Sequence, residues 1–507
     1  MSAQPAWMTP LPDAEQQRAT DQWAIEDRGI PGVELMERAG AGLAAMVQDR
    51  AATGRVAVVC GKGNNGGDGL VVARLLRGRG REVDVLLLAP ADEFRGDAHS
   101  NLERLQGPAP VPFTPAALQG TSAIVDAILG TGFEGEPRDP ARSAIEAING
   151  ASGDAMIFAC DVPSGVDSST GEIAGVAVTA DATATFHAGK PGLWIAPGKA
   201  HAGDVTVVDI GIPAGAPVTA QIGLIEATVT DSIPQRGRES TKFAAGAVFV
   251  CGGSLGLTGA PSLASEAATR AGAGYVTAFV PSSLNQIFEV RLLEVMTVPL
   301  PDLDGALQPE GVGRIAARLD RAGSLVLGPG IGREPATVDF CRALARRAKL
   351  PLLLDADGLN AHAEHLELLA ERPAATVMTP HAGELGRLLG LPSTEIERRR
   401  LAYARQAASQ AQAVVVLKGD DTIVAEPSGA TAVSRGGAAA LATAGTGDVL
   451  SGVIGAYLAK RMDPFEAACA GVLVHARAGQ LAAEWIGPEG VIARDVIDAL
   501  PRARLSS

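Results

Sequence analysis

The sequence has few cysteines, few aromatic residues and little positive charge for its length. Its five cysteines are widely separated among 507 residues, so it lacks metal-knuckle spacing, and a reducing compartment is expected. Aromatic residues make up 4% of the chain, which argues against a surface that stacks bases or sugars. The net charge of −14 would repel a nucleic-acid backbone or an anionic membrane. We therefore expect neither nucleic acid nor membrane as a partner.

Long hydrophobic runs are also missing. No run approaches the roughly 18 apolar residues that a membrane span needs. The first residues contain neither the basic nor the apolar segment of a secretory signal. Hydrophobic residues at 47% and charged residues at 20% are typical of a globular chain. We therefore expect a cytoplasmic protein of roughly two to four domains.

Short apolar runs alternate with longer amphipathic stretches along the whole chain. Runs such as 56–60, 123–128 and 156–160 are too continuous for half-exposed strands and suit parallel strands buried on both faces. This alternation predicts an α/β fold throughout. Because parallel sheets bind ligands at the carboxyl ends of their strands, the loops after these runs are the places to search for sites.

A change in composition marks one domain boundary. The stretch after Ile212 is rich in Pro, Ala and Gly and lacks helical periodicity, so we place the boundary between about Pro213 and Gly223. The prediction is two domains, residues 1–215 and 222–507. Their glycine loops differ in spacing, so the halves are not repeats.

A glycine-rich loop follows the first buried run. Its sequence, Gly61-Lys-Gly-Asn-Asn-Gly-Gly-Asp-Gly69, precedes a predicted helix, where backbone N–H groups can approach an anion. It matches the dinucleotide fingerprint only formally, since the acidic residue expected after the next strand is missing. A plain strand-to-helix turn explains the glycines alone. Two amides and a carboxylate in the same turn are more polar than a turn requires.

Two further strand ends in this half are polar, and one carries a carboxylate within an apolar run. That residue is Asp126, which needs a cation or several hydrogen-bond donors nearby if it is buried. Asn65, Asp126 and Ser164 together offer hard oxygen ligands for one cation. A hydrogen-bond network that joins the loops is the alternative.

The motifs of this half resemble a known family. With NNGGD at 64–68, DAILGTGF at 126–133 and DVPSG at 161–165, residues of about 10–215 resemble the YjeF N-terminal domain, the NAD(P)H-hydrate epimerase family. The resemblance implies a Rossmann-like three-layer fold, a hydrated nicotinamide nucleotide as ligand, and K⁺ held by Asn65, Asp126 and Ser164. The implied substrate contacts are Asn64, Asn65, Gly66, Gly67, Asp68, Gly130, Thr131, Gly132, Phe133, Glu134, Gly135, Glu136 and Asp161. Asp161 is our candidate acid/base for epimerisation.

In the second half, a carboxylate stands in an anion-binding helix start. Ala444-Gly-Thr-Gly447-Asp448 precedes an apolar helix, and its N–H groups form an anion hole. A carboxylate there makes sense as a base that deprotonates a hydroxyl attacking phosphorus, or it simply caps the helix. Other polar segments follow apolar runs: GPGIG at 328–332, DADGLN at 355–360, TPHAGE at 379–384 and KGDDT at 418–422. His362 and His365 are interpreted as a solvated helix face.

These segments resemble the YjeF C-terminal domain, the ADP- or ATP-dependent NAD(P)H-hydrate dehydratase family. The resemblance spans roughly residues 222–500 and implies a ribokinase-like fold. It implies that the nucleotide is bound by Lys418, Gly419, Asp420, Asp421, Thr422 and Gly447. It further implies that the hydrate faces Ala260, Gly330, Gly332, His381 and Asp448, with Asp448 as the catalytic base.

The chemistry implied by the two resemblances is consistent. Hydroxide is a poor leaving group, and phosphorylating the ring hydroxyl turns it into a good one that the enamine nitrogen can expel. Asp448 would remove the hydroxyl proton, glycine amides would hold the transferring phosphoryl, and Mg²⁺ would shield its charge. We expect NADHX and NADPHX as substrates, ADP or ATP as co-substrate, and a homo-oligomer.

Two other functions compete with this interpretation. The second half could be a kinase of a small hydroxylated vitamin precursor, because the ribokinase-like fold serves such enzymes too. The first half could be a non-catalytic binding module, although the presence of Asp126, Asp161 and Ser164 speaks against that.

Overall fold

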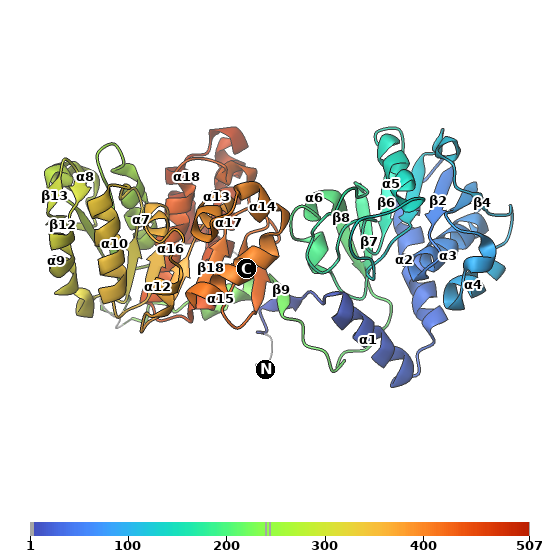
Figure 1. Ribbon diagram of the computed structural model, residues 1–507, viewed down its shortest axis with the longest axis horizontal. Helices are drawn as coiled ribbons and strands as arrows, with labels where there is room; N and C mark the ends of the chain where they lie inside the picture. The colour runs from blue at the N-terminus through green and yellow to red at the C-terminus, as the bar shows by residue number, and fades with distance from the viewer. Residues whose placement is uncertain (1–4, 239–240, 243–244, 506–507) are drawn as a thin grey trace. The chain divides into compact units, whose positions relative to one another are not determined.

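The chain forms two compact units in the computed structural model, which describes residues 5–238, 241–242 and 245–505 (Figure 1). The first unit contains Pro10–Gly223 and the second contains Leu224–Ser507 together with the short segment Pro5–Thr9. The sequence analysis assigned that segment to the first domain. It lies in the second unit because its residues enter the sheet and core there.

The first unit is built on a seven-stranded parallel sheet. In spatial order its strands are β4 (Val111–Pro112), β3 (Val83–Leu87), β2 (Val56–Cys60), β5 (Ala123–Ala127), β6 (Met156–Cys160), β7 (Ala182–Phe186) and β8 (Asp204–Val208). The chain runs outward from β2 to β4, then returns to β5 on the other side of β2. This reversal creates a crevice at the carboxyl ends of β2 and β5, where open α/β sheets bind ligands.

Both faces of this sheet are buried, so the fold has three layers. Along β2, Val58 enters a core shared with the helices α2 and α3, whereas Val59 enters a core shared with α5 on the opposite face. The helices of the unit are α1 (Ala14–Glu26), α2 (Gly32–Arg50), α3 (Asn64–Gly78), α4 (Gly96–Glu103), α5 (Ala141–Gly150) and α6 (Lys199–Ala202). The Rossmann-like α/β prediction is confirmed.

The second unit contains an eleven-stranded sheet. Its order is β1 (Met8–Pro10), β9 (Ile222–Ile225), β20 (Thr431–Val433), β19 (Ile423–Ala425), β18 (Val414–Leu417), β17 (Thr376–Met378), β16 (Leu352–Leu354), β15 (Ser324–Leu327), β10 (Ala247–Cys251), β11 (Tyr275–Pro281) and β12 (Met296–Leu300). The strands from β18 to β12 are parallel, and β18, β19 and β20 pair antiparallel. A small hairpin of β13 (Asp302–Leu303) and β14 (Ala306–Leu307) stands apart.

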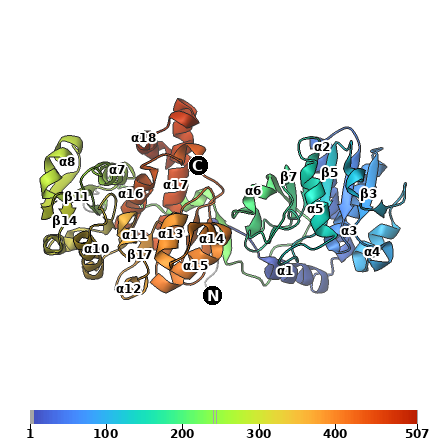
Figure 2. The ribbon, with the colours of Figure 1, turned by 45° about the horizontal axis from the view of Figure 1, so that its top comes forward.

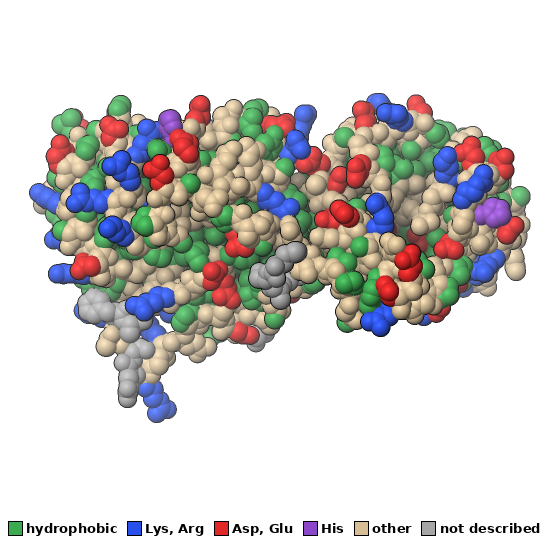
Figure 3. Space-filling view, turned by 60° about the horizontal axis from the view of Figure 1, so that its bottom comes forward, with side chains coloured by type: hydrophobic (Ala, Val, Ile, Leu, Met, Phe, Trp, Pro, Cys, Tyr) green, Lys and Arg blue, Asp and Glu red, His purple; other side chains and the backbone are tan. Residues whose placement is uncertain are grey.

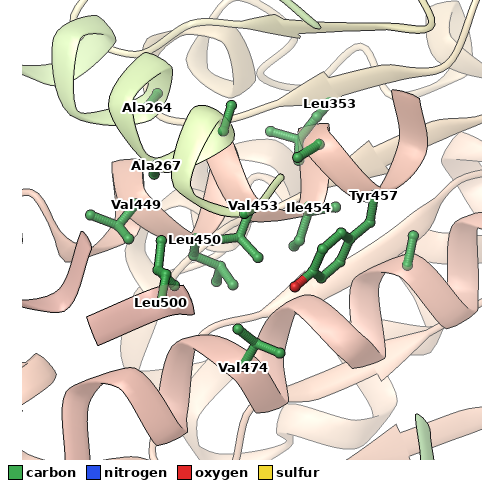
Figure 4. Packing of buried hydrophobic residues seen from close by; sticks show 14 of the residues in the cluster. Ala264, Ala267, Leu353, Val449, Leu450, Val453, Ile454, Tyr457, Val474 and Leu500 are labelled. Carbon is green, nitrogen blue, oxygen red and sulfur yellow. The ribbon is translucent and has the colours of Figure 1, made fainter. Parts of the chain in front are cut away.

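A buried helix organises the core of this unit. The helix is α16 (Thr446–Ala459), whose Val449, Val453 and Tyr457 lie among side chains of its neighbours (Figure 4). Its packing against α7 (Gly259–Arg270) needs Gly452, since a Cβ there would meet the carbonyl oxygen of Ala264 at 2.1 Å. The helix start that carries Asp448 is therefore held rigidly by packing.

The remaining helices surround this sheet (Figure 2). They are α7 (Gly259–Arg270), α8 (Asn285–Arg291), α9 (Val312–Ala316), α10 (Pro335–Arg347), α11 (Asp357–Asn360), α12 (Glu367–Ala370), α13 (Ala382–Leu389), α14 (Ser393–Arg398), α15 (Arg400–Ala411), α17 (Pro464–Ile486) and α18 (Ala493–Ala503). Within the described part of the chain, none of the helices combines the length and apolarity that crossing a bilayer requires.

The segment before β1 is anchored in the second unit by an aromatic contact, which gives a first prediction. The Trp7 and Phe465 ring centroids lie 5.9 Å apart, and Trp7 Nε1 donates to Glu466 Oε1 at 3.1 Å. Trp7→Ala should lower the free energy of unfolding of this unit by about 3 kcal/mol. Trp485→Ala, at a Trp that is 54% exposed, is the matched control and should cost much less. Denaturant unfolding measures both, and equal losses would contradict the anchoring role.

Candidate active sites

A cavity of about 880 Å³ lies in the first unit, at the crevice that the strand order creates. Its walls include the loops after β2, β5 and β6, together with α1. Of the predicted substrate contacts, those that line it are Asn64, Asn65, Asp68, Gly130, Thr131, Gly132, Phe133 and Asp161. The motifs separated in sequence therefore meet at one site.

The predicted contacts that do not line the cavity have other positions. Gly66 and Gly67 are buried under it: a Cβ on Gly66 would meet the carbonyl oxygen of Gly61 at 1.8 Å, and one on Gly67 would meet Met36 Sδ at 2.7 Å. These glycines let the backbone of the turn pack tightly. The exposed residues Glu134, Gly135 and Glu136 lie outside the cavity lining, and Glu136 forms an ion pair with Arg142.

The three predicted cation ligands lie together, with Asn65 in the cavity lining and Asp126 and Ser164 outside it. Ser164 Oγ donates to Asp126 Oδ1 at 2.6 Å, and Ser164 N donates to Asp126 Oδ2 at 2.8 Å. Asn65 Nδ2 donates to the carbonyl of Leu129, while Asn65 Oδ1 is buried without a partner among the described residues. Burial raises the pKa of Asp126 to about 6 despite these hydrogen bonds. A buried carboxylate and an unpaired oxygen fit a hard cation such as K⁺.

Asp161 lies in the cavity wall and is held by four donors. Lys190 Nζ donates to Asp161 Oδ1 at 2.6 Å, Thr185 Oγ1 and Phe186 N donate to the same oxygen, and Thr131 Oγ1 donates to Oδ2. Burial alone would raise the pKa of Asp161, but the charge of Lys190 and the hydrogen bonds hold it below its usual value. The group therefore stays ionised, which favours an electrostatic role.

Several cavity residues were not found by sequence reasoning. Lys190 is almost fully buried, and Gln17, Arg18 and Asp21 reach the cavity from α1. Gln17 Nε2 donates to Asp21 Oδ1 at 2.8 Å. Lys190 carried a usable signal, since it follows the apolar strand β7 closely in sequence. α1 carried none, because nothing local ties an ordinary amphipathic helix to a distant cavity.

In the second unit, the start of α16 lies beside a lysine and several carboxylates. Gly445 precedes the helix with a φ of 90°, a left-handed conformation that suits glycine. A Cβ on Gly447 would lie 3.5 Å from Lys418 Nζ. Burial and the nearby charge of Asp355 raise the pKa of Asp448 to about 7, against the opposing charge of Lys418. Such a carboxylate accepts a proton readily near neutral pH.

Lys418 joins the segments that the sequence analysis treated separately. Its Nζ lies 3.1 Å from Asp355 Oδ1 and 3.6 Å from Glu384 Oε2. Ser451 Oγ, on the second turn of α16, donates to Asp355 Oδ2 at 2.7 Å. The sequence analysis named Asp355 only as part of the polar segment 355–360 and did not identify Ser451.

His381 caps helix α13. Its Nδ1 accepts from the backbone N–H groups of Gly383 and Glu384, and Glu384 Oε2 accepts from His381 N at 3.0 Å. Burial lowers the pKa of His381, so the imidazole is neutral at pH 7. Its half-exposed ring remains accessible to a ligand.

The remaining predicted hydrate contacts lie where two loops meet. A Cβ on Gly330 would be 3.2 Å from Ala260 Cβ, and Ser254 Oγ donates to the carbonyl of Gly330. A Cβ on Gly332 would lie 3.4 Å from Ser254 Oγ. The GPGIG loop and the start of α7 therefore form one surface.

Not every residue of the segment 418–422 is available to a nucleotide. Asp421 is buried and paired with Arg400 Nε at 2.9 Å. Thr422 Oγ1 donates to the carbonyl of Gly419 at 2.6 Å and closes the turn, while Asp420 Oδ1 accepts from Gly437 N. Lys418 is thus the residue that connects this segment to Asp448 electrostatically.

The interpretation of His362 as part of a solvated face is wrong. His362 is buried, and its Nδ1 lies 2.9 Å from the carbonyl of Gly358. His365 is half exposed, as expected. Two histidines three residues apart face different directions here because the short helix α11 ends at Asn360.

Comparison with known proteins gives each half a family. Residues 32–192 match the family described as YjeF-related protein N-terminus, and residues 248–502 match NAD(P)H-hydrate dehydratase. The combination defines a two-domain protein with a YjeF-type α/β unit and a dehydratase unit. Both resemblances inferred from the motifs are confirmed.

Full-length relatives carry the same combination. A bifunctional NAD(P)H-hydrate repair enzyme of Moorella thermoacetica is 39% identical over 95% of this chain and 94% of its own length. One from Salinibacter ruber is 40% identical over 97% and 96%. The chain belongs to the family of bifunctional NAD(P)H-hydrate repair enzymes. Among solved structures, an ADP/ATP-dependent NAD(P)H-hydrate dehydratase from Bacillus subtilis, co-crystallised with ATP and Mg²⁺, is 29% identical, with a TM-score of 0.48 over 54% of this chain and 94% of that chain.

The buried ion pair in the first unit gives a stability prediction. Lys190→Met should lower the free energy of unfolding of this unit by about 3–5 kcal/mol, because it leaves the Asp161 carboxylate buried and unpaired. This loss of stability should become smaller at low pH. Because the pKa of Asp161 is lowered in the folded state, the ion pair stabilises the unit at neutral pH, and this stabilisation disappears as the pH falls through that pKa.

The control for this prediction is an exposed lysine. Lys62 pairs with Glu93 at the surface, so Lys62→Met should change the free energy of unfolding by less than about 1 kcal/mol. Chemical denaturation at neutral and acidic pH measures both variants. A Lys190→Met protein as stable as the control at neutral pH would show that the pair contributes little.

Proposed function

We propose that this chain repairs hydrated nicotinamide nucleotides: the first unit interconverts the R and S epimers of NADHX and NADPHX, and the second dehydrates the S epimer with consumption of ADP or ATP. The observation that carries the proposal is that each family's motifs meet in one place in the fold. In the first unit they surround the cavity at the crevice. In the second they surround Lys418 and Asp448.

In the dehydratase unit, the carboxylate of Asp448 takes the proton of the ring hydroxyl as the hydroxyl attacks phosphorus. Lys418 and the N–H groups at the start of α16 hold the nucleotide phosphates, and His381, Ala260 and the GPGIG loop orient the hydrate. Three carboxylates, Asp355, Glu384 and Asp448, surround the single lysine, so the site fits Mg²⁺ arriving with the nucleotide. Bound Mg²⁺ supplies charge neutralisation for the phosphoryl group.

In the epimerase unit, Asn64, Asp68, the 130–133 loop and Asp161 contact the hydrate. Beneath the hydrate, K⁺ would be held by Asn65 Oδ1, Asp126 and Ser164. The ion would supply positive charge against the buried Asp126 carboxylate. Two repair steps on one chain fit the chemistry, because a dehydratase that accepts one epimer needs a supply from the other.

The surface agrees with small-molecule substrates. Acidic and basic side chains are interspersed on the face shown in Figure 3 rather than gathered into a basic patch. The expected homo-oligomer stays a prediction, which light scattering coupled to size-exclusion chromatography would test.

The decisive experiment is incubation of the protein with an epimer mixture of hydrated NADH and either ADP or ATP. We expect the near-ultraviolet absorbance of reduced nicotinamide to recover to the level at which both epimers have been converted. A phosphorylated product that accumulates without dehydration would instead favour the vitamin-precursor kinase.

Asp448 provides the sharpest variant. Asp448→Asn should lower dehydration by roughly 10²–10⁴-fold, the usual contribution of a positioned base, and leave epimerisation intact. In the wild type, kcat/KM for dehydration should rise with pH as Asp448 loses its proton around pH 7. The variant should lack that rise.

The exposed Asp498, on α18, offers the matched control. Asp498→Asn should dehydrate like the wild type across the pH range. Near-normal dehydration by Asp448→Asn would mean that this carboxylate merely caps its helix.

The cation site can be tested without any assay of activity. Crystals soaked in thallium or rubidium salts should show anomalous density bounded by Asn65, Asp126 and Ser164, since an all-oxygen site prefers hard ions. The density should vanish in the Asp126→Ala variant. It should persist in the control variant Asp84→Ala, because the wild-type Asp84 carboxylate is only partly buried and pairs with Arg55. A water-filled site in the wild type at high K⁺ would defeat the assignment.

A further inference from the structure

Asp68 differs from the other buried carboxyl groups of the protein. It is 9% exposed, lines the cavity of the first unit, and has no hydrogen-bond partner among the described residues. Among the residues that the structure describes, the other buried carboxyl groups all accept hydrogen bonds: Asp126, Asp161, Asp355, Glu384 and Asp421. A buried, unpaired carboxyl group is costly, so its retention at a cavity wall points to a partner that arrives with the ligand.

The charges around Asp68 are arranged against its ionisation. Burial and the negative charges of Asp161 and Asp21 raise the pKa of Asp68 well above its usual value, and Lys190 opposes this only partly. Lys190 is already bound to Asp161, whose pKa it helps to lower. The titratable groups near Asp68 are thus Asp21 on α1, Asp161 after β6, Lys190 after β7, and Cys160 at the end of β6, whose own pKa is raised by burial and by the charge of Asp68.

Among the carboxyl groups that line this cavity, Asp68 and Asp161 therefore have pKa values shifted in opposite directions. The raised pKa of Asp68 favours its protonated form, and the lowered pKa of Asp161 favours its ionised form. Pairs of carboxyl groups whose environments separate their proton affinities in this way serve as an acid and a fixed anion in enzymes. Asp161 has little freedom to exchange a proton, because its two oxygens are occupied by Lys190, Thr131, Thr185 and the Phe186 amide.

We propose that Asp68 is the catalytic residue that donates the proton in epimerisation, and that Asp161, held by Lys190, stabilises the cation formed on the substrate ring. This proposal rests on the epimerase activity proposed above and assigns the acid of that same site. It gives Asp161 an electrostatic part in place of the acid/base work first considered for it.

In the proposed step, Asp68 gives its proton to the hydroxyl of the hydrated ring carbon. The carbon–oxygen bond then breaks, and the hydroxyl leaves as water. The lone pair of the ring nitrogen forms a carbon–nitrogen double bond, which places a positive charge near the Asp161 carboxylate. Water then adds to the opposite face of the same carbon. Its proton returns to the Asp68 carboxylate, through cavity water where needed, and the enzyme is restored.

The first test is the pH dependence of epimerisation by the full-length wild type, followed by chromatographic separation of the epimers with the uncatalysed rate subtracted. Because the acid must be protonated, kcat should be level at lower pH and fall as the pH rises through the pKa of Asp68. A catalysed rate that does not fall with rising pH would overturn the proposal, independently of any variant.

Variants sharpen the test. Asp68→Asn should lower kcat by roughly 10²–10⁴-fold with little change in KM, and its residual rate should lack the falling limb. Asp21→Asn should keep the limb but move it to lower pH, because removing one neighbouring negative charge makes Asp68 a stronger acid. An Asp68→Asn enzyme with the wild-type rate and pH profile would refute the assignment.

These experiments distinguish failure of the role proposed for Asp68 from failure of the proposed epimerase activity. A wild type that does not interconvert the epimers at all would refute the proposed epimerase activity. If the wild type interconverts the epimers and the Asp68→Asn variant does so at an equal rate, only the role of Asp68 is refuted. Near-ultraviolet circular dichroism of each variant verifies that its aromatic side chains keep their packing.

Discussion

A carboxyl group removed from water stays ionised only with a cation or several donors beside it, and otherwise its pKa rises; both sites of this protein follow from that constraint. In the first unit, Lys190 reaches Asp161 and is nearly fully buried in doing so. In the second, Lys418 lies between Asp355 and Glu384. Lys190 helps to hold the pKa of Asp161 below its usual value, and Lys418 forms ion pairs with Asp355 and Glu384. Asp68 in the first site and Asp448 in the second are left with raised pKa values. The reactive groups that we propose, Asp68 and Asp448, are thus carboxyl groups with which the lysines form no ion pair.

Close backbone packing holds these charges in position. Gly66 lets the turn after β2 lie against Gly61, and Gly452 lets α16 approach α7. A side chain at either glycine would separate elements whose ends carry site residues. The glycine-rich motifs therefore act through packing as well as through the N–H groups they expose.

Much of the fold was predictable because its signal is local. Continuous apolar runs such as 56–60 become strands buried on both faces, as their lack of alternation indicated. The loops that follow them converge, because all strands of a parallel sheet end at the same edge. That rule predicts that Asn65, Asp126 and Ser164 lie close together.

The sequence by itself determined the α/β class, the family of each half and the motif residues at the strand ends. Tertiary structure alone decided that Pro5–Thr9 joins the second unit and that His362 is buried. It also decided that both oxygens of Asp161 accept hydrogen bonds while Asp68 accepts none from the described residues. The reason is physical. Strand burial and turn chemistry depend on neighbours in sequence, whereas the protonation of a carboxyl group depends on charges such as Asp21 and Lys190 that only folding brings near it.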